Sequence, residues 1–98
     1  MQIKAGVKIQ GIKPEMILAC QVTEFWLPGF TMTSCIDGKH STRSKHKLGY
    51  AIDIRTRDIS LDQCQTATSG IQQALGGEYF VLLETDHIHI QFNGSEIL

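Results

Sequence analysis

The four histidines of this chain fall into two clusters, His40 with His46 and His87 with His89, and no other histidine occurs in its 98 residues. Imidazole nitrogens bind metal ions and transfer protons near neutral pH, most often together with a carboxylate. The sequence therefore directs attention to carboxylates that the fold could bring beside both clusters.

Asp53 is the first such carboxylate. Apolar and polar side chains alternate from Tyr50 to Arg55, which predicts a half-buried strand with Asp53 on its polar face. His46 lies at the end of the loop that leads into this strand, and Gly49 can adopt a positive φ where the loop turns. Ala51 is too small to fill the space beside Asp53.

His87 and His89 are two residues apart in a second predicted strand, so both imidazoles project from the same face. If this strand pairs near the Asp53 strand, His46, Asp53 and one of these two histidines converge. Two imidazoles and one carboxylate leave a fourth position for water, which is typical of a catalytic zinc site.

A general base would have to come from Glu84 or Asp86. Both lie an odd number of residues from His89, so neither would share its face in a regular strand. A turn or bulge before Ile88 would bring one of them into reach, and the polar run before Ile88 is compatible with that. Asp86 is the nearer residue and is favoured over Glu84.

Periodicity predicts the remaining elements, two helices and further strands. The first helix begins at Pro14 and ends before Pro28 and Gly29; the second follows a capping signal at Ser60. The predicted ranges are a helix over 13–26, a strand over 30–34, a loop over 36–47, a helix over 61–75, and strands over 79–83 and 88–92.

These elements predict an α+β fold: a small, mostly antiparallel sheet with two helices packed on one face. In the first helix, the apolar spacing assigns the core face to Ile17, Leu18, Val22, Phe25 and Trp26. We expect Phe25 and Trp26 to be core residues, not a platform for sugar binding.

Composition limits the classes of protein. With 42% apolar residues and a net charge of −1, the 98 residues predict one domain over 1–98 and argue against a nucleic-acid binder. We expect no membrane insertion, and the first residues lack the apolar run of a signal peptide, so we expect a chain that is cytoplasmic at synthesis. Three cysteines without a CxxC pair favour buried thiols.

Two motifs carry a resemblance to a known family. Residues 44–53 read SKHKLGYAID, which resembles the SxHxxGxAxD signature of zinc D-alanyl-D-alanine carboxypeptidases and dipeptidases and of phage endolysins that cleave L-alanyl-D-glutamate bonds. Asp86 to His89 is similar to the second motif of that family. Asp37 to Asp53 also resembles the Hedgehog signalling domain, which shares the fold and the zinc site.

The resemblance implies roles for individual residues. It implies that zinc is bound by His46, Asp53 and His89, with Asp86 as general base and His87 beside the oxyanion.

We also expect His40, Arg43 and Ser44 to contact substrate, and for His40 this follows from its match to a Hedgehog histidine near the zinc. The chain departs from the family after Thr33 and Ser34, where many members carry an arginine for a substrate carboxylate. Arg43 and Arg55 are the candidates to replace that arginine.

The leading hypothesis is a zinc-dependent peptidase acting on bacterial cell-wall peptides, with peptidoglycan peptide as its partner and release to the wall on lysis. The residues alone lead only to metal-assisted hydrolysis; the substrate class comes from the resemblance. One alternative is a zinc-stabilised binding module of the Hedgehog type without turnover. Another is a metal-dependent phosphoesterase, which the near-neutral charge and the single carboxylate ligand disfavour.

Overall fold

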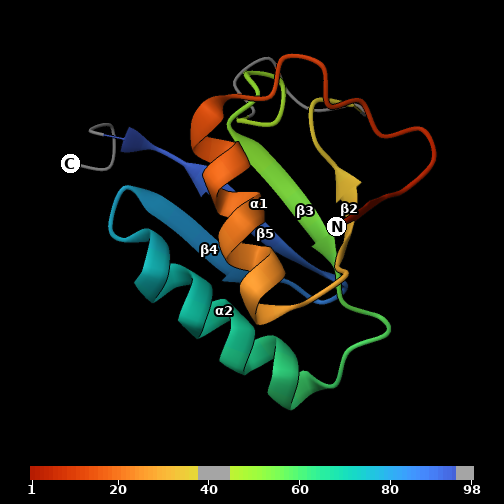
Figure 1. Ribbon diagram of the computed structural model, residues 1–98, viewed down its shortest axis with the longest axis vertical. Coiled ribbons are helices and arrows are strands. Elements are labelled where there is room, and N and C mark those ends of the chain that lie inside the picture. The colour runs from red at the N-terminus through yellow and green to blue at the C-terminus, as the bar shows by residue number, and fades with distance from the viewer. Residues whose placement is uncertain (38–44, 95–98) are drawn as a thin grey trace.

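The computed structural model describes residues 1–37 and 45–94, and within them it shows two helices and a five-stranded mixed sheet (Figure 1). The order of strands in the sheet is β1-β2-β3-β5-β4, and only the β1–β2 pair is parallel. The elements are β1 (Gln2–Ile3), α1 (Pro14–Trp26), β2 (Thr31–Ser34), β3 (Ala51–Arg55), α2 (Leu61–Leu75), β4 (Tyr79–Leu83) and β5 (His87–Phe92).

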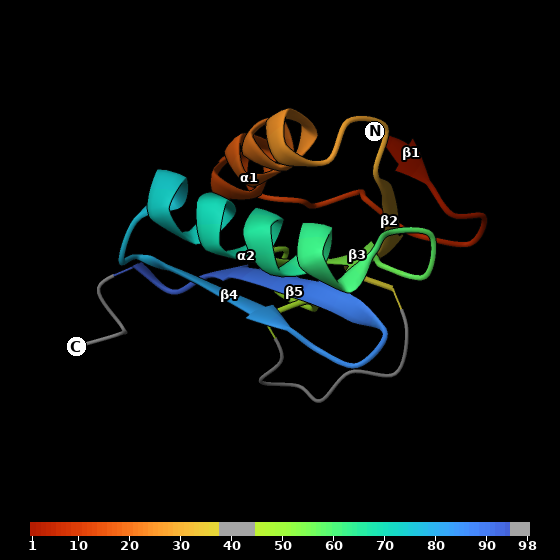
Figure 2. The ribbon, with the colours of Figure 1, turned by 90° about the horizontal axis from the view of Figure 1, so that it is seen from below.

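The predicted α+β class is confirmed, since both helices pack on the same face of a mostly antiparallel sheet (Figure 2). Strand β1 was not predicted, because two residues are too few to show a period. Neither helix in the described ranges is long and apolar enough to cross a membrane.

The alternation of side chains along β3 and β5 divides the sheet into two chemically different faces. Ile52 and Ile54 of β3 and Ile88 and Ile90 of β5 have no exposed surface and lie under the helices. Their neighbours along each strand point to the opposite face, which the helices leave uncovered. The polar residues of β3 and β5 are therefore gathered on that open face.

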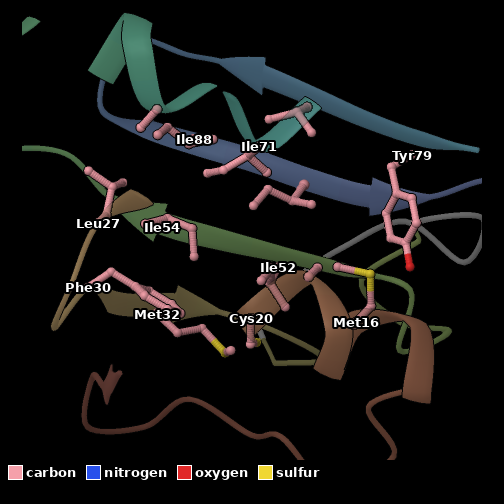
Figure 3. Close-up of a cluster of buried hydrophobic side chains, with 14 of the residues drawn as sticks. Met16, Cys20, Leu27, Phe30, Met32, Ile52, Ile54, Ile71, Tyr79 and Ile88 are labelled. Carbon is pink, nitrogen blue, oxygen red and sulfur yellow. The ribbon is translucent and has the colours of Figure 1, made fainter. Parts of the chain in front are cut away.

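The core lies between the sheet and the helices. Figure 3 shows side chains from both helices and from β2, β3 and β5 packed into one cluster. The largest side chains without exposed surface include Met16, Met32, Ile52, Ile54, Ile71, Ile88 and Ile90. Cys20, Cys35 and Cys64 are all buried and free, as their spacing predicted.

The predicted core face of α1 is mostly wrong, although Val22 is half-buried and packs against the core as expected. Its buried residues are Met16, Ala19, Cys20 and Thr23. This face combines the large Met16 with three small side chains, and the Thr23 hydroxyl is satisfied by donating to the Ala19 carbonyl at 2.7 Å.

The large apolar residues of α1 lie on its outer side instead. Phe25 is 78% exposed, Ile17 47% and Leu18 49%, and Trp26 at 37% is only partly covered. The expectation that Phe25 and Trp26 are core residues therefore fails for Phe25 and holds only in part for Trp26. Hydrophobic periodicity marked an apolar stripe, but the face that packs into the core is the adjacent one.

The second helix begins and ends as predicted. The Ser60 side chain accepts a hydrogen bond from the Gln63 backbone, and Gly76 ends the helix with φ +88°. Gln72 then joins this helix to β4: its amide donates to the carbonyls of Gly76 and Tyr79 and accepts from the Val81 backbone, at 3.0 to 3.1 Å. These bonds fix the strand that pairs with β5.

The two helices are in close contact at Gly70 of α2. A Cβ atom at this position would overlap the indole ring of Trp26 at the end of α1. Glycine weakens a helix, yet here it makes room for the neighbouring aromatic ring. Gly70 therefore sets the distance between α1 and α2.

We predict that Gly70→Ala destabilises the protein by about 1 to 3 kcal/mol through overpacking, although helix propensity alone would give a gain of about 1 kcal/mol. Chemical denaturation measures the difference. Gly77→Ala is the matched control, because a Cβ there meets nothing within 4 Å and should leave the denaturation midpoint unchanged. A stabilised Gly70→Ala variant would show that the helices are not in close contact at this point.

Candidate metal centre

The register of the sheet places Asp53 of β3 directly opposite His89 of β5. His89 Nδ1 lies 3.0 Å from Asp53 Oδ1. His46 approaches the same oxygen from the turn before β3, with its Nε2 at 3.2 Å. The structure thus brings together the three residues that the sequence proposed as metal ligands, and it selects His89 over His87.

The turn that carries His46 is closely held. Gly49 has φ +81°, and a Cβ atom there would overlap the carbonyl oxygen of Gly11. Lys13 donates its backbone N–H to the Gly49 carbonyl at 3.0 Å, and Gly49 donates to the His46 carbonyl at 3.0 Å. The glycine of the motif is therefore needed for both its conformation and its lack of a side chain.

The orientation of the His46 ring is set by the end of β2. The register between β2 and β3 shifts between Met32 and Ser34, a bulge that places Ser34 opposite Asp53 and Cys35 just beyond it. His46 Nδ1 donates to the Cys35 carbonyl at 2.7 Å. Asp37 supports this segment by accepting from the Cys35 backbone N–H at 2.9 Å.

The His89 ring is oriented from its other side. His89 Nε2 lies 2.6 Å from Gln91 Oε1, and Gln91 Nε2 donates to Asn93 Oδ1 at 2.7 Å. Gln91 and Asn93 follow His89 at steps of two along the chain, so all three lie on the open face.

Three acceptor atoms converge as a result. Because the carbonyl of Cys35 and the amide oxygen of Gln91 can only accept, each neutral imidazole has its proton on the outer nitrogen. The inner nitrogens, His46 Nε2 and His89 Nδ1, then direct lone pairs toward the Asp53 carboxylate. Such an arrangement requires either additional protons on the rings or a cation between them.

His46, Asp53 and His89 therefore form a group that could hold a metal ion. One ligand atom from each residue lies within 4.8 Å of the other two. His46 is buried, with 5% of its surface exposed, and the other two are half-buried. The two outer hydrogen bonds resemble the contacts that commonly fix the tautomer of metal-binding histidines.

The charges of the site fit a cation. Burial alone would raise the pKa of Asp53, but hydrogen bonds to His46 and His89 outweigh it and hold this pKa far below its usual range. Burial tends to lower the pKa of His89, but hydrogen bonds with Asp53 and Gln91 raise it overall. Asp53 thus remains ionised and attracts positive charge from both sides.

His87 lies at the edge of this group. Its Nε2 is 3.7 Å from Asp53 Oδ1, and its Nδ1 is 2.6 Å from Asp86 Oδ1. The Asp86 side chain is 87% exposed and precedes β5 in a bend, as the strand-parity argument required. Asp86 reaches the site through His87, whose other nitrogen faces Asp53.

Glu84 directly follows β4, in the connection that leads to β5. Its backbone N–H donates to the His87 carbonyl at 2.8 Å, which places it across the hairpin from His87. Residues opposite each other in paired strands project to the same face, so Glu84 can share the face of His87 although it lies an odd number of residues from His89. The negative charge of Glu84 also contributes to raising the pKa of His89. The choice between Asp86 and Glu84 as base stays a prediction.

A cleft of about 400 Å³ opens beside Asp53 and His87. Its cationic lining comes from Arg55, which pairs with His87 in the sheet register, and from Lys4 and Arg57. The remaining predicted substrate contacts, His40, Arg43 and Ser44, lie outside the described residues.

Sequence reasoning missed the groups that hold the ligands. Gln91 could have been found, since it follows His89 by two residues in a predicted strand and so shares its face. The Cys35 carbonyl gave no signal, because a backbone atom carries no residue-type information. Lys4 also gave none, because its place beside the cleft depends on the pairing of β1 with β2.

Comparison with protein-family models, curated proteins and solved structures finds no match to this chain. The resemblance of its two motifs to zinc peptidases therefore stays a prediction.

We predict that the protein binds one divalent metal ion and that Asp53→Asn weakens this binding by more than about 100-fold, because loss of a direct ligand costs more than loss of an outer contact. Isothermal titration with Zn²⁺ of protein treated with a chelator measures the affinity. Asp58→Asn is the control, as Asp58 is an exposed carboxylate paired with Arg57. Equal affinity in the Asp53 variant and the wild type would place the bound metal elsewhere.

Proposed function

We propose that this chain is a zinc-dependent hydrolase that cleaves a peptide bond in bacterial cell-wall peptides. The observation that carries the metal-dependent part is the convergence of His46 Nε2, His89 Nδ1 and Asp53 Oδ1 beside an open cleft.

The donor set and its spacing fit Zn²⁺. Zinc ligands at about 2.0 to 2.1 Å in a tetrahedron lie about 3.3 Å apart, close to the 3.2 and 3.0 Å found between Asp53 and the two histidines. Three protein ligands leave a fourth position open, and the adjoining cleft gives access to it. When bound, zinc supplies an acidified water and polarises a carbonyl group.

The residues beside the site have complementary tasks in this proposal. Asp86 accepts a proton from the attacking water and returns it to the leaving amine. His87, held by its 2.6 Å contact with Asp86, faces the place where negative charge develops on the carbonyl oxygen. Both groups lie at the start of β5, with His87 two residues and Asp86 three residues before His89, so the strand orients them together with that ligand.

The substrate class is supported by the two motifs. The first contains His46 and Asp53, the second contains Asp86 and His89, and their predicted metal ligands lie in one group. A match at fixed positions in two separate segments that the fold joins is stronger support than either motif alone.

The cleft supports recognition of a carboxylate on the substrate. Arg55 is half-buried on the same sheet face as Asp53, and no carboxylate within residues 1–37 and 45–94 pairs with it. An arginine in such a position binds carboxylates in a planar, two-point geometry. In this proposal Arg55 takes the place of the arginine that the family motif has and this chain lacks.

A second candidate is a zinc-stabilised binding module without turnover. The observation that favours it is the position of Asp86, which is largely exposed and contacts His87 rather than the three metal-binding residues. Activity measurements on carboxylate variants distinguish the two candidates.

We predict that Asp86→Asn lowers the rate of peptide hydrolysis by about 100- to 10,000-fold, the usual contribution of a general base. Zinc affinity should stay within about 3-fold of the wild type, because Asp86 contacts His87 and none of the three metal-binding residues. Loss of a contact that supports a metal ligand would lower the affinity about 10-fold or more. Mass spectrometry of muropeptide digests measures the rate, and titration calorimetry the affinity.

Glu84→Gln is the competing variant and should retain most of the activity. Loss of activity in Glu84→Gln and not in Asp86→Asn would assign the base to Glu84. Stoichiometric zinc without products from any wall peptide would favour the binding module.

We predict that Arg55→Gln raises KM by about 10- to 100-fold for a peptide with a free carboxylate, the value of a charged hydrogen bond. The same variant should leave KM unchanged for the corresponding amide. Arg57→Gln is the matched control, since Arg57 lines the same cleft but is 71% exposed and lies beside Asp58. An equal effect on the acid and the amide would argue against carboxylate recognition by Arg55.

A further inference from the structure

A row of polar side chains continues from the metal centre to the end of β5. His89, Gln91 and Asn93 point to the same open face, and consecutive members are joined at 2.6 and 2.7 Å. Gln91 is half-buried between Ala51 of β3 and Phe80 of β4, its partners in the register. Neither neighbour offers a polar side-chain atom, so the amide of Gln91 is directed along its own strand.

The orientation of the Gln91 amide determines the state of His89. With its oxygen toward the ring, the amide requires a proton on His89 Nε2, and Nδ1 keeps the lone pair that faces Asp53. With the amide reversed, its NH₂ group would face Nε2, and the proton of a neutral ring would move to Nδ1. A protonated Nδ1 cannot bind a metal ion.

Asn93 supports the orientation that the structure shows. Its Oδ1 accepts from Gln91 Nε2, which leaves Oε1 as the only atom of the amide that can face His89. The main chain of Asn93 is held in place because its N–H donates to the Glu78 carbonyl at 2.8 Å, just before β4 begins. Two consecutive contacts, Asn93 to Gln91 and Gln91 to His89, thus favour a proton on Nε2 of His89.

We propose that Gln91 and Asn93 are positioning residues for the metal centre, which select Nδ1 as the metal-binding nitrogen of His89. The inference rests on the metal site of the proposed function and does not require that the protein cleave peptides. It assigns a task to two residues outside both sequence motifs.

The test compares zinc affinity across variants of the row. Gln91→Leu removes the acceptor and should weaken zinc binding by about 10- to 100-fold, the usual effect of an outer contact to a metal-binding histidine. Gln91→Glu keeps an acceptor at the same place and should bind zinc with an affinity within about 3-fold of the wild type. That difference is smaller than the effect of losing an outer contact. Gln73→Leu, on the exposed side of α2, is the matched control and should have no effect.

Asn93 gives an independent variant pair. Asn93→Asp retains an oxygen that accepts from Gln91 and should bind zinc as the wild type does. Asn93→Leu frees the Gln91 amide to reverse and should weaken binding, by less than Gln91→Leu does. If Asn93 acts on His89 through Gln91, the loss of affinity in Asn93→Leu must be the smaller of the two.

A spectroscopic measurement separates positioning from a merely structural role. In the zinc-loaded wild type, the ¹⁵N shifts of His89 should show a metal-bound Nδ1 and a protonated Nε2. Metal-free Gln91→Leu should fold with an unchanged melting temperature but show a mixture of tautomers at His89. An unchanged zinc affinity and an unchanged tautomer in folded Gln91→Leu would overturn the proposal, as would zinc binding through Nε2.

The measurements also distinguish this inference from the proposed function. Wild-type protein that binds zinc and cleaves no peptide would refute the enzyme and leave the roles of Gln91 and Asn93 to be decided by the variants. Wild-type protein that binds no divalent metal would refute both.

Discussion

The structure depends on one electrostatic constraint, the approach of two imidazole lone pairs to a single carboxylate oxygen. Left alone, His46 Nε2, His89 Nδ1 and Asp53 Oδ1 would repel one another, because all three are acceptors when the rings are neutral. A positive charge at this point removes the conflict, whether it comes from protons or from a metal ion. The outer hydrogen bonds to both histidines hold the three residues in an arrangement that could bind a metal ion.

The fold satisfies this constraint by separating its two faces. The isoleucines of β3 and β5 form the core under α1 and α2, and the residues between them form the site on the open side. Because the side chains of a strand alternate, the same two strands that stabilise the domain also fix the distance between Asp53 and His89. In a chain of 98 residues, whose core is necessarily small, a bound metal would add stability at the face that no helix covers.

The parts of the prediction that depended on strand alternation succeeded, and those that depended on helix faces were less accurate. The period-two pattern placed Asp53, His87 and His89 on one face, which the register confirms. In α1 the apolar spacing indicated the wrong side, because the helix buries the face of Met16 and Ala19 and leaves Phe25 outside. Burial in a helix depends on what packs against it, whereas alternation in a strand is a property of the backbone itself.

By itself, the sequence determined the class of fold, the sheet face of the site, and the set of residue types able to bind a metal. Those features follow from local periodicity and from the chemistry of histidine and aspartate, which are present before the chain folds. The residues alone left His87 and His89 open, and the tertiary structure placed His89 across from Asp53, as the motif resemblance had implied. The tertiary structure alone decided which nitrogen of each ring turns inward. These outcomes required a strand register, a bulge before Cys35 and an amide at Gln91, since the orientation of an imidazole is set by partners that its own sequence position does not specify.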